Sequence, residues 1–84
     1  MTREQLRDVI LYLLHEIAPE AQLQEMSPGA NLREALGLDS FDFLNFVVAV
    51  HETLSINVPT DEYSELATLG NCIEYLTRAY ERGT

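Results

Sequence analysis

The 84-residue sequence contains no lysine and no tryptophan, and it has a single cysteine, Cys72. The absence of lysine excludes Schiff-base and lysine-nucleophile chemistry. One cysteine excludes an internal disulfide. Neither Cys72 nor the two histidines, His15 and His51, have neighbours in the sequence at the spacing of zinc ligands. We therefore expect neither a disulfide nor a metal site.

Long apolar runs are also missing. No stretch approaches the roughly 18 residues that a membrane-spanning helix needs, and the first residues lack the apolar region of a signal peptide. We expect a cytoplasmic protein with no membrane span. A chain of 84 residues has room for one hydrophobic core. The predicted organisation is therefore one domain covering residues 1–84, and we expect it to be a monomer.

Basic residues are scarce. Five arginines stand against 14 acidic residues, which gives a net charge of −9. Nucleic acid is excluded as a partner class, because binding to phosphates needs a basic face. A strongly negative field instead favours encounter with enzymes that have basic docking patches.

Hydrophobic residues recur at helical spacing in three segments, and no alternation typical of strands occurs. The first predicted helix covers residues 2–17, where Thr2 and Gln5 form a candidate capping box. Its predicted buried stripe is Leu6, Val9, Ile10, Leu13, Leu14 and Ile17. The last helix is capped by Thr68 and runs to about residue 82, with a stripe of Leu69, Cys72, Ile73, Leu76 and Tyr80. Because Cys72 falls on this stripe, we interpret it as a packing residue and not a reactive thiol.

A long connection, residues 19–38, follows the first helix. Asn31 is placed to cap a short helical turn over residues 32–36 that Gly37 would close. We expect the connection to pack on the bundle through Leu23, Met26, Leu32, Leu36 and Leu38. A further short turn, capped by Thr60, is expected over residues 61–66. The predicted fold class is all-α: a four-helix bundle of three main helices and one short helix, with a long first loop.

The second main helix is predicted over residues 40–54, with two apolar stripes. The stripe assigned to the core is Phe43, Phe46, Val47, Val50 and Leu54. A neighbouring stripe consists of Phe41, Leu44 and Val48. It has two interpretations: the helix is buried on two sides, or the stripe is a docking surface for a partner.

Ser40 stands at the start of this helix. Asp39 suits the N-cap, and Asp42 lies three residues later, where the helix dipole favours negative charge. Ser40 would then present its hydroxyl at a rigid corner, although a serine here is also an ordinary way to begin a helix. No histidine lies close in sequence, and the flanking carboxylates disfavour an alkoxide. We interpret Ser40 as a substrate of another enzyme, and the protein as a non-enzyme.

The surrounding sequence resembles the acyl carrier protein family over nearly the whole chain. The residues that carry the resemblance are Gly37-Leu38-Asp39-Ser40-Phe41-Asp42, Phe46-Val47-Val48-Ala49-Val50, Val58-Pro59, Asp61-Glu62, Thr68-Leu69 and Ile73-Glu74-Tyr75-Leu76. In that family an Asp-Ser-Leu triplet carries the serine that receives 4′-phosphopantetheine. The resemblance implies a small acyl-carrier-like bundle with this cofactor on Ser40, beside Asp39 and Phe41.

The resemblance also implies partners and surfaces. A phosphopantetheinyl transferase (holo-acyl-carrier-protein synthase) using coenzyme A would attach the arm, whose thiol holds acyl groups as thioesters for enzymes of fatty acid, lipid or specialised acyl biosynthesis. The implied partner-docking residues are Asp42, Leu44, Val48, His51 and Glu52. The implied acyl pocket is lined by Phe43, Phe46, Val47, Val58, Tyr63 and Leu66.

Several residues depart from the family pattern. Phe41 replaces the leucine of the triplet, Val48 replaces a methionine, and Asn45 and His51 stand where acidic residues are usual. Tyr63 is bulkier than the usual residue near the arm. These departures favour a specialised carrier with its own partner set. His51 is either a solvated helix residue or a group that makes docking depend on pH.

Two alternatives remain at this point. A free-standing peptidyl or aminoacyl carrier would share the fold and the serine chemistry, but Gly37-Leu38-Asp39-Ser40 lacks the Gly-Gly-(His/Asp)-Ser pattern frequent in that group. An unmodified acidic helical adaptor would bind partners through Phe41, Leu44 and Val48, with Ser40 incidental.

Overall fold

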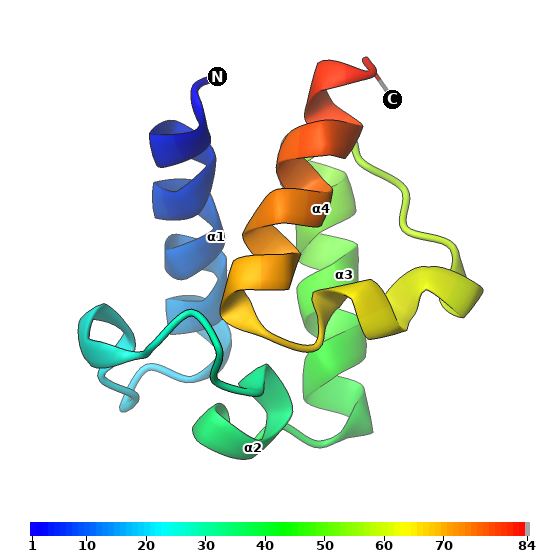
Figure 1. The fold of residues 1–84 in the computed structure, drawn as a ribbon. Coiled ribbons are helices and arrows are strands. Elements are labelled where there is room, and N and C mark those ends of the chain that lie inside the picture. Colours follow the sequence, from blue (N-terminus) through cyan, green and yellow to red (C-terminus); the bar gives the residue numbers. More distant parts are fainter. Residues whose placement is uncertain (84) are drawn as a thin grey trace.

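The computed structural model describes residues 1–83, apart from the side chain of Gln24, and three long α-helices dominate this part of the chain (Figure 1). Helix α1 spans Arg3–Ile17, α3 spans Ser40–Leu54 and α4 spans Leu69–Glu81. Helix α1 packs against both α3 and α4 and runs in the opposite direction to them. The start of α3 therefore lies at the end of the bundle opposite to the start of α1.

Three shorter elements lie between the long helices. Helix α2 spans Leu32–Leu36, and the 3₁₀-helices η1 and η2 span Leu23–Glu25 and Thr60–Leu66. Helix α2 lies beside the start of α3, and η2 packs against α4. Within residues 1–83 no strand is present beyond one isolated bridge, between Asn31 and Thr68. The predicted all-α bundle is confirmed.

The predicted caps form at the starts of all four α-helices of residues 1–83, and Asp39 makes the cap of α3. Thr2 Oγ1 accepts a hydrogen bond from the Gln5 amide at 3.1 Å, and Gln5 Oε1 accepts one from the Thr2 amide at 2.8 Å. Asn31 caps α2 and Thr68 caps α4 through the same type of bond. Each such cap stabilises its helix by about 1 kcal/mol, because it satisfies an amide that has no partner inside the helix.

The prediction that Thr60 caps the second short turn is wrong. Thr60 is itself the first residue of η2, the preceding residue is Pro59, and no side chain caps this element. The proline ring holds φ of Pro59 at −62°, and the Pro59 carbonyl accepts the first bond of the turn from the Glu62 amide at 2.9 Å. The proline therefore starts the element one residue earlier than the cap pattern indicates.

The core face of α3 is confirmed, since all five predicted residues are buried: Phe43, Phe46, Val47, Val50 and Leu54. In α1, Val9 and Ile17 are only half-buried, whereas Leu11 is buried although the predicted stripe omitted it. The residues around η1, led by the buried Leu23, pack on that side of α1. In α4, Ala79 is buried and Tyr80 is half-buried.

The long connection is attached to the segment before α4 by backbone hydrogen bonds. The Leu32 amide donates to the Ala67 carbonyl at 2.8 Å, and the Gly70 amide donates to the Pro28 carbonyl at 2.8 Å. A Cβ atom at position 70 would lie 3.1 Å from that carbonyl oxygen, so the close approach favours glycine. The predicted anchors Leu23, Leu32 and Leu38 are buried, and Met26 and Leu36 are half-buried. The connection is packed, as predicted.

Cys72 is fully buried in α4, and burial raises the pKa of its thiol to about 12. This confirms its interpretation as a packing residue, because a reactive cysteine needs an accessible thiolate. In residues 1–83 no group of three or more histidine, cysteine and acidic side chains is arranged to hold a metal ion. No helix within these residues is long and apolar enough to cross a membrane.

The Cys72 thiol predicts a loss of stability at high pH. In the unfolded chain the thiol has a pKa of about 8.5, so between about pH 8.5 and 12 the folded state holds a proton that the unfolded state has released. The free energy of unfolding should therefore fall as pH rises, by up to about 1.4 kcal/mol per pH unit. Urea unfolding of the wild type and Cys72→Ala between pH 8 and 10.5 measures this slope, which should be shallower in the variant. Equal slopes would contradict the prediction.

Candidate functional site

A tight turn connects α2 to α3. Gly37 adopts a left-handed backbone conformation with φ 67°, and its amide donates to the carbonyl of Arg33. The amide of Leu38 donates to the same carbonyl at 2.9 Å, and the Leu38 side chain is buried. This pattern ends α2 and lets α3 begin three residues after Gly37. The turn therefore fixes α2 against the start of α3.

The first turn of α3 is a complete capping box. Asp39 Oδ1 accepts a hydrogen bond from the Asp42 amide at 2.8 Å, and Asp42 Oδ2 accepts one from the Asp39 amide at 3.4 Å. Both carboxylates lie where the helix dipole favours negative charge. Ser40, the first residue of the helix, is exposed. The predicted geometry of Asp39, Ser40 and Asp42 is confirmed.

Sequence reasoning missed the residue that contacts Ser40. The Arg33 guanidinium donates a long hydrogen bond, 3.4 Å, from Nη2 to Ser40 Oγ. The same guanidinium lies over the ring of Phe43, with its carbon 5.9 Å from the ring centroid. A separation of seven residues places two side chains on one face only within a continuous helix, and the αL turn at Gly37 interrupts the helix between Arg33 and Ser40. Only the conformation of that turn brings the two side chains together.

Ser40 has no general base among the described residues. Its side-chain partner within residues 1–83 is Arg33, a cation that donates hydrogen bonds and accepts none. The neighbouring carboxylates of Asp39 and Asp42 bond to backbone amides of the helix start. The site therefore presents an exposed hydroxyl that none of the described residues activates as a nucleophile.

The second apolar stripe of α3 is open to solvent. Phe41 is 78% exposed, Leu44 46% and Val48 47%. The alternative of a helix buried on two sides is therefore wrong for this chain. Of the other predicted docking residues, His51 and Glu52 are exposed and Asp42 is half-buried. The three apolar residues, called the α3 strip below, lie on the helix that begins with Ser40.

The predicted acyl-pocket residues divide into two groups. Phe46, Val47, Val58 and Leu66 are packed inside the core, with no more than 7% of any side chain exposed. Phe43 and the half-buried Tyr63 meet edge to face, with ring centroids 5.8 Å apart. These two rings border a cavity of about 300 Å³, called the α2–η2 groove, whose other lining residues are Asn31, Arg33, Ser64 and Ala67.

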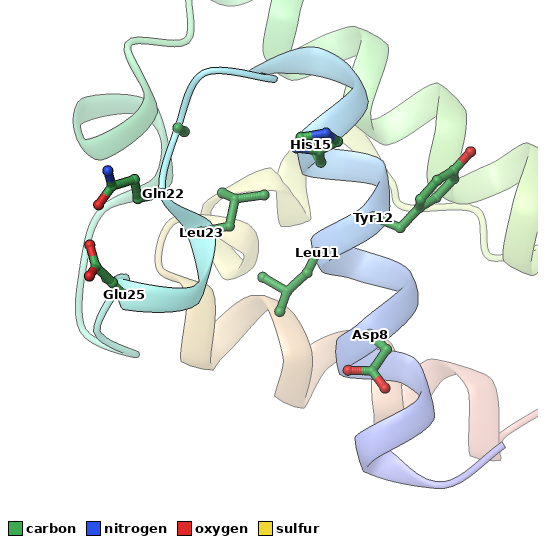
Figure 2. A pocket seen from close by; sticks show the side chains of 8 residues that line it. Asp8, Leu11, Tyr12, His15, Gln22, Leu23 and Glu25 are labelled. Atoms are coloured by element: carbon green, nitrogen blue, oxygen red, sulfur yellow. The ribbon is translucent and has the colours of Figure 1, made fainter.

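Other cavities lie elsewhere among the described residues. A hollow of about 450 Å³ borders the other side of the α2–α3 turn, and Glu20, Leu38 and Asp42 are among its lining residues. A larger one, of about 760 Å³, lies between α1 and residues 21–25, with Leu11 and Leu23 facing one another across it (Figure 2). None of the predicted site residues lines this larger cavity.

Comparison with known proteins identifies the family. Residues 4–76 match the family model described as a phosphopantetheine attachment site. A protein named as a mitochondrial acyl carrier protein of Schizosaccharomyces pombe is 33% identical over 55 residues, which are 66% of this chain and 49% of that protein. The acyl carrier protein of Amoebophilus asiaticus is 33% identical over 54 residues, 64% of this chain and 68% of the relative. That of Acidothermus cellulolyticus is 26% identical over 81 residues, 94% and 93% of the two chains.

The family match covers most of the chain, so the chain belongs to the acyl carrier protein family. Proteins of this family are carriers and not enzymes, and they work with partner enzymes. Their cofactor is 4′-phosphopantetheine, attached by a phosphopantetheinyl transferase. The chain spans about half the length of the S. pombe relative and most of the length of the A. cellulolyticus one.

The left-handed turn at Gly37 predicts a specific loss of stability. Gly37→Ala should lower the free energy of unfolding by about 1–2 kcal/mol, because a side chain at φ 67° is strained. Gly29→Ala is the matched control, since a Cβ there meets nothing within 4 Å and its φ lies outside the left-handed range. Urea unfolding of the two variants measures the difference. The prediction fails if both variants are as stable as the wild type.

Proposed function

We propose that the chain carries acyl groups as thioesters on a 4′-phosphopantetheine arm attached to Ser40. The observation behind this proposal is the exposed Ser40 hydroxyl, at the start of α3 in the sequence Asp39-Ser40-Phe41, inside the segment that matches the family model. The first residue of a capped helix holds its side chain in a fixed position outside the barrel. Such a position suits a hydroxyl that another enzyme must reach.

The residues around Ser40 fit the chemistry of this group. A phosphodiester is an anion, and the Arg33 guanidinium lies within hydrogen-bond distance of Ser40 Oγ. The rest of the arm contains amides and a hydroxyl, and the α2–η2 groove offers polar groups from Asn31 and Ser64 beside the ring of Phe43. When bound, the group supplies a thiol that forms thioesters. The chain itself supplies a fixed attachment oxygen, a nearby cation and an adjacent cavity.

The α3 strip is the surface that we assign to partner enzymes, together with Asp42, His51 and Glu52. Three exposed apolar side chains on one helix form a patch typical of binding surfaces. The net charge of −9 adds a field that attracts enzymes with basic patches and raises their association rates. The strip is part of α3, so an enzyme bound there has the attachment residue within the same rigid element.

For the acyl chain we propose shelter between α3 and η2, with Phe43 and Tyr63 at the entrance. The inner residues Phe46, Val47 and Leu66 are closely packed, so a cargo must part them. Each methylene group taken from water contributes about 0.8 kcal/mol, which offsets the cost of opening the core. Acyl chains long enough to recover that cost should enter, and very short ones should stay outside.

The cargo and the pathway of the proposed carrier are more specific than its membership of the family. The relatives are named as acyl carrier proteins, which favours acyl over aminoacyl cargo. The departures at Phe41, Asn45, Val48 and His51 favour a specialised partner set.

The expectation of a cytoplasmic protein stays a prediction, because one relative is named as mitochondrial. Organisation as one domain over residues 1–84 also stays a prediction.

Modification at Ser40 is tested directly. Incubation with coenzyme A and a broad-specificity phosphopantetheinyl transferase should add the mass of one phosphopantetheine to the wild type and to Ser27→Ala, a control at another exposed serine. Ser40→Ala should gain nothing, because the accepting oxygen is gone. Intact-protein mass spectrometry reads the result. An unmodified wild type would instead support the unmodified acidic adaptor.

Docking through the α3 strip predicts a second result. The double variant Leu44→Ala, Val48→Ala should raise the KM of the transferase for this carrier about fivefold or more, which corresponds to about 1 kcal/mol of lost binding. Its free energy of unfolding should change little, since both side chains are about half exposed. Tyr12→Ala, a 60% exposed residue on α1, is the control. Equal KM values for the three proteins would exclude the strip as the docking surface.

A further inference from the structure

Arg33 differs from the other arginines in what its side chain contacts, and not in lacking an ion pair, which Arg7 and Arg82 also lack within residues 1–83. The protein has five arginines against 14 acidic residues, and Arg3 and Arg78 both pair with Glu74 on α4. Arg33 makes no ion pair with any carboxylate in residues 1–83, although Glu34 is its sequence neighbour. Its side-chain contacts are instead Ser40 Oγ and the face of Phe43. An exposed arginine in so acidic a protein is therefore held beside the hydroxyl of Ser40 without a counterion.

Both the backbone and the side chain of Arg33 are held by contacts. Its carbonyl accepts hydrogen bonds from the amides of Gly37 and Leu38, which fixes its backbone relative to the start of α3. Its guanidinium lies over the Phe43 ring at cation–π distance, which favours this orientation of a long side chain. Less conformational entropy remains to be lost when the guanidinium binds an anion.

The charges around Ser40 favour a nearby cation once an anion is attached. Asp39 and Asp42 already place two carboxylates in the first turn of α3. Of the two hollows that are lined by residues of both α2 and α3, the one with Glu20 and Asp42 is acidic, whereas the α2–η2 groove contains Arg33 and no carboxylate among its lining residues. A negative group on Ser40 is repelled by the first and attracted by the second.

From this arrangement we infer that Arg33 is a positioning residue that pairs with the phosphodiester on Ser40 and directs the arm toward the α2–η2 groove. The inference rests on the proposed attachment to Ser40. A guanidinium suits the role better than an ammonium group, because its planar fork donates two parallel hydrogen bonds to phosphate oxygens. The Phe43 ring beneath Arg33 and the polar groups of Asn31 and Ser64 then lie on the path of the arm.

The experiment uses the full chain in its unmodified and modified forms. The proteins are the wild type, Arg33→Gln, Arg33→Lys and the control Arg82→Gln, which removes an exposed arginine at the end of α4. Mass spectrometry first establishes that each protein has gained one phosphopantetheine. Nuclear magnetic resonance then records the ³¹P signal of the phosphodiester from low to high salt, and the Nε–Hε signal of Arg33 before and after modification.

If Arg33 pairs with the phosphodiester, modification shifts the Arg33 Nε–Hε signal of the wild type. The ³¹P signal of the wild type then moves with added salt toward its position in Arg33→Gln, because salt screens an exposed ion pair. The ³¹P signal of Arg33→Lys should lie between those of the wild type and Arg33→Gln, and that of Arg82→Gln should match the wild type.

The inference is overturned if the ³¹P signals of the wild type and Arg33→Gln coincide at every salt concentration and the Nε–Hε signal stays unchanged. A wild type that gains no mass overturns the attachment to Ser40 itself, so the two failures are distinguishable.

Discussion

The backbone hydrogen bonds between residues 28–32 and 67–70 are the constraint on which the functional end of the molecule depends. They join a long connection to the segment that leads into α4, and they lie far apart in sequence. Each contributes only about 0.5–1.5 kcal/mol, less than the cost of ordering even a few residues of backbone. Their main effect is to determine where α2 lies. Together with the buried leucines of the connection, they place α2 beside η2. The α2–η2 groove, and Arg33 at its edge, exist because of that placement.

Helix α3 combines three tasks in one rigid element. One face, which includes Phe46 and Val50, is completely buried and anchors the helix in the core. A neighbouring face exposes Leu44 and Val48, and the first residue presents the Ser40 hydroxyl. Because the α3 strip and Ser40 belong to one α-helix, the spacing between them is constant. A partner that binds the strip, as proposed, would therefore meet Ser40 at a fixed distance.

Local patterns in the sequence predicted much of the fold and the start of the site. The caps at Thr2, Asn31, Asp39 and Thr68 formed because each depends on residues only three apart. The contact of Arg33 with Ser40 could not be predicted, since it depends on the direction in which the Gly37 turn sends α3. The burial of Leu11 was missed for a related reason: the residues around η1 that pack beside it belong to a connection with no periodic signal. Contacts made by turns and loops are set by tertiary structure, which residue spacing does not encode.

The end of the molecule that contains Ser40 has two surfaces that differ in charge. The α3 strip is followed on the same helix by Glu52, whereas the α2–η2 groove has the Arg33 guanidinium at its edge. A basic enzyme surface is attracted to the acidic molecule as a whole but repelled locally by Arg33, so electrostatics favours approach along α3 and leaves the groove free. In the proposed modified form, the anion on Ser40 has the opposite preference and would be drawn toward Arg33. On this proposal, the charge that repels a basic enzyme surface from the groove is also the charge that pairs with the phosphodiester. The partner surface and the tethered arm would then lie on different sides of Ser40.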